Sequence, residues 1–288
     1  MPTLTLKQAA ARHWPEYLIE GWALGMFMVS AGLVGVLLDA HGSPVRSLIP
    51  DPDFRRVLGG LAMGATAIAL IYSRWGQRSG AHMNPAVTAT FYLLGKTGGS
   101  DALFYIGAQF LGGLLGVGLV VAIAGAAFTT GDVNYVVTAP GPRGPGVAFL
   151  AEVGISALMM FAVLTVSSRP RLARYTGLLA GVLVACFISL EAPLSGMSMN
   201  PARSFASAAP AGMWMHLWVY FTAPFLGMGG AAALRRLLDG GDRVPCAKFD
   251  HPLDVRCIHC GHEPAPKFAL DPRTRPQPRP LTRTESST

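Results

Sequence analysis

The apolar positions of this chain fall into long, nearly uninterrupted blocks. Six of these blocks approach or exceed the roughly 20 residues that a helix needs to cross the hydrocarbon core of a bilayer. They are Tyr17–Leu38, Val57–Tyr72, Leu103–Ala126, Val147–Val166, Tyr175–Leu190 and Trp214–Leu238. The pattern therefore predicts an all-α membrane protein with six transmembrane helices.

Two shorter apolar segments, Pro85–Leu94 and Pro201–Ala211, are too short to span a bilayer. Segments of this length are typical of re-entrant half-helices. Each follows the second of three spans, so the chain divides into two halves of the same design. Because three is an odd number of spans, the second half runs in the opposite direction. The sequence thus predicts an inverted 3+3 repeat, which places a binding site near the midplane between the halves.

Charge is scarce and unevenly distributed. Charged residues make up 14% of the chain, against about 25% in an ordinary soluble domain. Residues 239–288 hold 15 of the 39 charged side chains. We predict an N-terminal cytoplasmic segment (1–16), a membrane channel domain (17–238), a cytoplasmic Cys/His-rich tail (239–263) and a disordered Pro/Arg-rich C-terminus (264–288).

The net charge of +7 is explained by topology. With the N-terminus inside, ten Lys and Arg residues fall on the inner side and four on the outer side. The positive-inside rule then predicts a multi-pass protein of the cell membrane, surrounded by lipid, with both termini in the cytoplasm. Nucleic acid is not an expected partner, because no basic run or basic stripe with interleaved aromatic residues occurs.

The tripeptide Asn-Pro-Ala occurs twice, as Asn84-Pro85-Ala86 and Asn200-Pro201-Ala202, each at the start of a predicted half-helix. Asparagine is a good N-cap and proline a good first helical residue. Two half-helices that meet end to end would bring two positive dipole ends together. The asparagine oxygens would cap these ends and leave the amide hydrogens free to point into a pore. A permeating oxygen could accept from them, while cations and protons would meet a positive barrier.

With these motifs the chain resembles the aquaporin, or major intrinsic protein, family over about residues 15–238. The matching residues are Glu20, Asn84-Pro85-Ala86, Gln109 with Gly112-Gly113, Glu152, Asn200-Pro201-Ala202-Arg203 and Pro224 with Gly227. The resemblance implies a passive channel for water and small neutral solutes, a homotetramer, and no cofactor for transport. It also implies that Glu20 and Glu152 support the re-entrant loops; direct lining of the pore by these carboxylates is the alternative.

Family spacing places a selectivity filter at Gly64, Ile188, Met197 and Arg203. By resemblance Arg203 donates to the solute and repels cations, although an ion pair with Glu191 would also explain it. Water-selective members carry an aromatic residue and a histidine where this chain has Gly64 and Ile188. A wider and more apolar filter is therefore expected, suited to glycerol, urea, ammonia, hydrogen peroxide or the neutral hydroxides of boron, silicon and arsenic.

Other positions favour a water-selective channel, so the substrate stays open at this point. Ser204 and Ala208 match the small residues of water channels, and Tyr220-Phe221 match an aromatic pair found in them.

The tail carries a candidate metal site. Cys246, His251, Cys257 and Cys260 form a Cys3His set that could hold zinc in a reducing cytoplasm. The spacing is not that of a standard zinc finger, and an absence of any defined role is the alternative.

Two further readings come from other functional classes. Glu20 or Glu152 could relay protons in a coupled secondary transporter, or the tail could be a metal-responsive gate or sensor. An enzyme is not expected, because the paired carboxylates lie in separate spans and no glycine-rich phosphate loop opens a helix.

Overall fold

The structure is a computed structural model that describes residues 4–239 and 244–264. Within these residues its secondary structure is helical, with no strand, and six helices are long and apolar enough to cross a membrane. They are α1 (Leu6–Asp39), α3 (Pro52–Tyr72), α6 (Gly99–Ala124), α8 (Pro145–Ser167), α9 (Thr176–Leu190, preceded by the 3-10 turn η2 at Ala173–Tyr175) and α12 (Leu217–Asp239). The predicted fold class is therefore confirmed.

Several helices begin well before the apolar blocks that predicted them. Helix α1 begins at Leu6, where Thr5 and Gln8 form a capping box. Helix α3 begins at Pro52, where the Asp51 side chain accepts from two backbone N–H groups. Caps and polar first turns lie outside a hydropathy signal, so the apolar blocks underestimate these helices.

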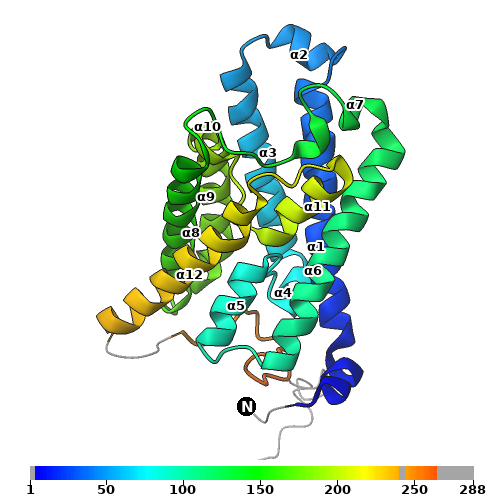
Figure 1. Cartoon of the computed structure of the whole chain (residues 1–288). Coiled ribbons are helices and arrows are strands. Elements are labelled where there is room, and N and C mark those ends of the chain that lie inside the picture. Colours follow the sequence, from blue (N-terminus) through cyan, green and yellow to red (C-terminus); the bar gives the residue numbers. More distant parts are fainter. Residues whose placement is uncertain (1–3, 240–243, 265–288) are drawn as a thin grey trace, which may run out of the picture.

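Two half-helices complete the core, α5 (Pro85–Leu93) and α11 (Pro201–Ala211). Figure 1 shows them between α12 and α6, both of which they contact, with α5 toward one end of the bundle and α11 farther toward the other. The remaining helices are short connectors. They are α2 (Pro44–Leu48), α4 (Arg74–Ser79), α7 (Ala126–Thr129), η1 (Asn134–Val136) and α10 (Ala192–Ser195).

Long helices pack most extensively as three pairs. Helix α1 packs on α6 in the first half, α8 packs on α12 in the second, and α3 packs on α9 across the two halves. Glycines permit the close approach of α1 and α6, because a Cβ at Gly112 would lie 1.9 Å from the carbonyl oxygen of Gly21. Large apolar side chains such as Leu115 and Leu150 are exposed on the outside of the bundle, as suits a lipid-facing surface.

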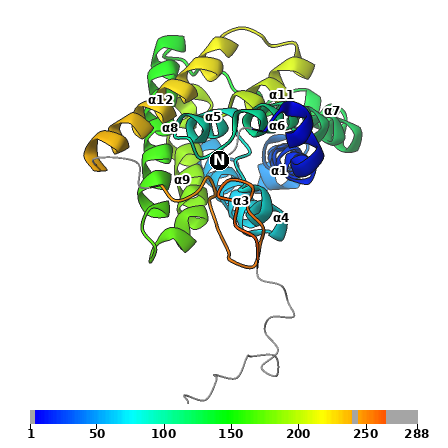
Figure 2. The same ribbon diagram turned by 90° about the horizontal axis from the view of Figure 1, so that it is seen from below.

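The two ends of the bundle differ. Residues 244–264, called here the tail segment, contain no helix or strand. In Figure 2 this segment lies across the bundle end near α3 and α4. We call this the tail end, and the opposite end, with α2 and α10, the far end. The described part of the tail is thus packed against the bundle, and the predicted disordered region lies, beyond Pro264, outside the described residues.

Candidate functional site

The two Asn-Pro-Ala segments meet through their asparagine side chains. Asn84 Oδ1 caps α5 by accepting from Ala86 N at 2.8 Å, and Asn200 Oδ1 caps α11 by accepting from Ala202 N at 3.1 Å. Asn84 Nδ2 also donates to Met199 O, and Asn200 Nδ2 donates to Met83 O, both at 2.7 Å. One amide hydrogen of each asparagine is therefore engaged in this cross-link. We expected both to be free; one per residue remains for another acceptor.

A buried carboxylate supports the first re-entrant loop. Glu20 is fully buried. It accepts from Ser79 Oγ at 2.7 Å, from the backbone N–H of His82 at 3.0 Å and from that of Met83 at 2.7 Å. Gln109 Nε2 adds a fourth bond at 2.9 Å. Glu20 thus holds backbone groups that would otherwise be unpaired inside the bundle.

The second loop repeats this arrangement. Glu152 is fully buried and accepts from Ser195 Oγ at 2.8 Å and from the backbone N–H groups of Ser198 and Met199, both at 2.7 Å. Neither Glu20 nor Glu152 lines the cavity described below. Their contacts are with loop groups and, for Glu20, with Gln109.

Each loop also holds two non-glycine residues in the left-handed region of backbone conformation. These are Ala81 (φ 55°) and Met83 (φ 50°) in the first loop, and Met197 (φ 48°) and Met199 (φ 53°) in the second. Such residues persist only where the surroundings determine the conformation. The carboxylate bonds to the loop amides supply that constraint.

Two tyrosines brace the same loops, a role that the sequence analysis did not predict for either of them. Tyr105 OH donates to Ser79 O at 2.7 Å, and Tyr220 OH donates to Ser195 O at 2.5 Å. Both serines stand five residues before an asparagine of the repeated motif. That shared position was the available signal for finding them.

A cavity of about 460 Å³ runs through the bundle beside the asparagines. Its wall includes Asp39 and Arg55 at the far end, both asparagines in the middle and Phe249 at the tail end. The wall is predominantly apolar, with contributions from α1, α3, α9 and both re-entrant loops. A path lined in this way can pass small uncharged molecules and offers few partners to an ion.

Of the four predicted filter positions, Ile188, Met197 and Arg203 line the cavity, whereas Gly64 does not. Gly64 faces α9 instead, where a Cβ would lie 2.5 Å from Gly181 O. A spacing counted along the chain cannot fix how a helix is rotated about its axis, and this assignment is therefore corrected.

Gly59 is a residue of α3 that lines the cavity beside the end of α9 that carries Ile188. Arg56 Nε donates to Ser189 O at 3.1 Å, and a Cβ at Gly60 would lie 2.6 Å from Ser189 Oγ. The helical turn of α3 at residues 56–60 therefore lies beside the C-terminal end of α9. Gly59 is in the cavity wall, and a Cβ there would meet only Leu38, at 3.5 Å.

Arg203 lies in the first turn of α11, beside its N-cap Asn200. Its backbone N–H donates to Asn200 Oδ1 at 3.2 Å, and its side chain donates from Nη1 to Val136 O at 2.9 Å. The two residues Arg203 and Glu191 form no ion pair in the described structure. Other guanidinium donors of Arg203 remain for a solute, since arginine carries five N–H groups.

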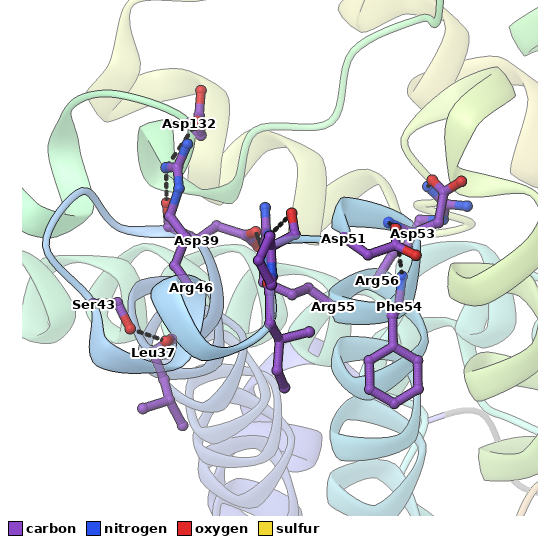
Figure 3. A network of polar contacts seen from close by, with 12 residues as sticks. Leu37, Asp39, Ser43, Arg46, Asp51, Asp53, Phe54, Arg55, Arg56 and Asp132 are labelled. Atoms are coloured by element: carbon purple, nitrogen blue, oxygen red, sulfur yellow. Dashed lines mark hydrogen bonds and ion pairs between the residues drawn. The ribbon is translucent and has the colours of Figure 1, made fainter.

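Ion pairs surround the far mouth of the cavity (Figure 3). Arg55 Nε pairs with Asp39 Oδ1 at 2.8 Å and its Nη1 donates to Ile49 O and Pro50 O. Arg56 Nη1 pairs with Asp53 Oδ1 at 2.7 Å. The Arg55 contacts tie the loop between α1 and α3 to the bundle, whereas the Arg56–Asp53 pair lies within α3.

The predicted metal ligands of the tail come together in space. The side-chain ligand atoms of Cys246, His251, Cys257 and Cys260 all lie within 4.8 Å of one another. Cys246 Sγ is 3.4 Å from Cys257 Sγ, and His251 Nε2 is 3.1 Å from Cys260 Sγ. Zinc–sulfur bonds of about 2.3 Å in a tetrahedron separate sulfurs by about 3.8 Å, so the cluster fits such an ion.

A further tail histidine joins the first loop instead of this cluster. His259 is buried, and its Nε2 donates to Ser79 O at 2.9 Å. Its ring stacks on that of His82, with centroids 5.3 Å apart. Burial, and then the neighbouring His82, lower the pKa of His259 to about 4. The ring is thus neutral at pH 7 and suited to this contact.

Known proteins match this chain over most of its membrane domain. The family model for the major intrinsic proteins matches residues 10–235. An Arabidopsis thaliana protein named as an aquaporin, NIP4-1, is 37% identical over 166 residues, which are 57% of this chain and 56% of that protein. The chain therefore spans little more than half the length of this relative. A glycerol uptake facilitator-like protein of Lactiplantibacillus plantarum is 34% identical over 191 residues, covering 64% of this chain and 85% of that protein.

The fold has a solved counterpart. The X-ray structure of the aquaglyceroporin from Plasmodium falciparum superposes with a TM-score of 0.62 at 18% sequence identity, covering 79% of this chain and 99% of that one. The family match, the helical inverted repeat and the paired loops agree with one another. The chain belongs to the major intrinsic protein family of membrane channels and is not an enzyme.

Proposed function

We propose that this protein is a passive channel that conducts water and small uncharged solutes along the cavity between its two halves. The observation that carries the proposal is the pair Asn84 and Asn200, whose side chains join two helix N-termini at the wall of a cavity extending toward both bundle ends. Each asparagine keeps one amide hydrogen for a passing oxygen. The helix dipoles and Arg203 repel cations and protons.

The filter we propose consists of Gly59, Ile188, Met197 and Arg203, with Gly59 in place of Gly64. Gly59 adds no side-chain bulk to the path, and Ile188 offers it no side-chain hydrogen-bond donor. We therefore infer that solutes larger than water pass. Glycerol, urea, ammonia, hydrogen peroxide and neutral metalloid hydroxides are the candidates. Met197 is long and flexible and could narrow the path, which keeps water selectivity as the competing outcome.

Glu20 and Glu152 act in this proposal as supports of the loops and not as carriers of protons. Their oxygens are engaged by loop donors, and neither lines the cavity. A proton-coupled transporter would require one of them to exchange protons with the path. The two mechanisms differ in their response to a pH gradient.

We further propose that the chain lies in the cell membrane with both termini in the cytoplasm and assembles as a homotetramer. The distribution of Lys and Arg supports the orientation. An exposed groove between α1 and α6, floored by Gly21 and Gly112 and edged by leucines, supports a helix-packing contact with another chain. For the tail we propose a zinc-class ion bound by Cys246, His251, Cys257 and Cys260.

Stopped-flow light scattering on proteoliposomes tests the transport proposal with water, glycerol and urea as probes. Gly59→Phe and Ile188→His should suppress glycerol and urea flux and spare water, whereas Gly107→Phe should change nothing. Gly107 is a matched control on α6, because nothing lies within 4 Å of a Cβ there. Wild-type flux should be the same with and without a pH gradient or a protonophore. Fast water flux with no glycerol flux would instead favour a water-selective channel.

A further inference from the structure

The tail segment reaches the cavity itself. Phe249 is only 6% exposed and belongs to the cavity wall at its tail end. It packs in the same apolar cluster as Ile71 of α3, Val87 of α5 and Met228 of α12. These residues come from both halves of the bundle, so the phenylalanine ring lies where the halves converge on the mouth. The ring therefore forms part of the wall at the tail-end mouth.

Hydrogen bonds to backbone carbonyl groups attach this part of the tail to the segment that leads into Asn84. His82 Nε2 donates to Ala247 O at 2.8 Å, and Phe249 N donates to Gly80 O at 3.3 Å. Lys248 Nζ donates to Gln77 O at 2.7 Å. Three successive tail residues thus bind the segment that leads into Asn84.

Two of the candidate metal ligands, Cys246 and His251, lie on either side of Phe249 in the sequence. Cys246 and His251 flank residues 247–250, while Cys257 and Cys260 lie farther along the tail and return to the same point. The tail segment has no helix or strand to hold its shape. An ion bound by these four side chains would cross-link the segment and stabilise one conformation of it.

We propose that a zinc-class ion on Cys246, His251, Cys257 and Cys260 locks the tail segment across the tail-end mouth and closes the channel with Phe249. Loss of the ion releases residues 244–262 and opens the path. This inference rests on the proposed channel function and adds its regulation. The ion binds thiolate and neutral imidazole ligands, so each thiol that is protonated before binding releases its proton to solvent, and no other bond of the chain is broken.

Full-length protein in proteoliposomes provides the test, with zinc as the probe. The forms compared are wild type, the double variant Cys257→Ser/Cys260→Ser, Phe249→Ala, and Cys186→Ser as the matched control. Cys186 lies exposed on α9, outside the cluster. Each form is measured after zinc loading and after treatment with a membrane-permeant chelator. The readouts are bound zinc per chain, water and glycerol flux, and hydrogen exchange of peptides from residues 244–262.

Wild type and Cys186→Ser should bind one zinc per chain, and zinc should reduce their flux several-fold. The double variant should bind no zinc at this site and should conduct like chelated wild type. Phe249→Ala should still bind zinc, and its tail should still be protected from exchange by zinc, but its flux should no longer respond. This variant therefore separates ion binding from closure.

Equal flux of zinc-loaded and chelated wild type, with zinc loss verified, would overturn the gate and leave the channel standing. Zinc inhibition of Phe249→Ala equal to that of wild type would overturn the assignment of closure to that ring. An absence of water and solute flux from every form, chelated ones included, would overturn the channel proposal and the gate with it.

Discussion

Gly64 of α3 faces Gly181 of α9 so closely that a Cβ at position 64 would lie 2.5 Å from the Gly181 carbonyl oxygen and 2.9 Å from the Cβ of Ala185. The nearest obstacle is backbone, which cannot rotate away as a side chain can. We therefore expect Gly64→Ala to reduce the free energy of unfolding by about 1–3 kcal/mol, the usual cost of overpacking. Thermal unfolding in detergent measures this.

The matched control for Gly64 is Gly229→Ala on α12, where nothing lies within 4 Å of a Cβ. It should be neutral or stabilise slightly, because alanine is the better helix former. Equal unfolding temperatures for the two variants would show that α3 and α9 are not in contact at Gly64.

Glu152→Gln should weaken the second loop. The carboxylate accepts from Ser195, Ser198 and Met199, but a glutamine amide nitrogen would face one of these donors with a donor of its own. Leaving a buried N–H unpaired costs about 1–3 kcal/mol. We expect a lower unfolding temperature and lower solute flux, and Glu20→Gln should act alike in the first loop.

The control for the glutamates is Asp132→Asn. Asp132 is an exposed partner of Arg46 at the far end, where a surface ion pair contributes about 0–1 kcal/mol. A loss of flux in Asp132→Asn as large as in Glu152→Gln would show that the carboxylate effect is not specific to the loops.

Tyr220→Phe should destabilise the protein more than Tyr105→Phe. Each tyrosine donates to a loop serine carbonyl, but Ser79 O also accepts from His259, whereas Ser195 O would lose its tyrosine donor with no such replacement. The difference should be about 1 kcal/mol, the net value of a typical hydrogen bond. Thermal unfolding of both variants measures it.

The double variant Tyr105→Phe/His259→Ala removes both donors from Ser79 O. It should lose more stability than the sum of its single variants, because either donor alone satisfies the carbonyl. Simple additivity would contradict the shared-acceptor geometry.

Asn200→Asp should impair the junction between the half-helices. It replaces an amide donor, 2.7 Å from Met83 O, by a second acceptor. Oxygen would then face oxygen at the cavity wall, so we expect lower stability and a strong loss of water flux, which stopped-flow scattering would detect. Asn84→Asp should behave in the same way toward Met199 O. Unchanged flux in both would remove the asparagines from the proposed path.

The architecture could be predicted because its signals are strong and local. Long apolar blocks mark the six helices, and the repeated Asn-Pro-Ala marks the two half-helices. Gly64 was misplaced because sequence spacing does not determine helix rotation, and only the contact with Gly181 resolves it. The docking of Phe249 could not be predicted, because an irregular segment has no periodicity to show which side chain turns inward. The serine–tyrosine braces could have been found by comparing the two repeats position by position.

The left-handed residues of the two loops have a consequence for how the protein is made. Helices as short as α5, with 9 residues, and α11, with 11, are marginal alone, and Ala81, Met83, Met197 and Met199 add backbone strain of order 1–3 kcal/mol each. The first loop depends on its bonds to Glu20 and the second on its bonds to Glu152, and both carboxylates are buried in the packed bundle. We therefore expect the six long helices to insert and assemble first during biogenesis, and the two loops to fold onto Glu20 and Glu152 last.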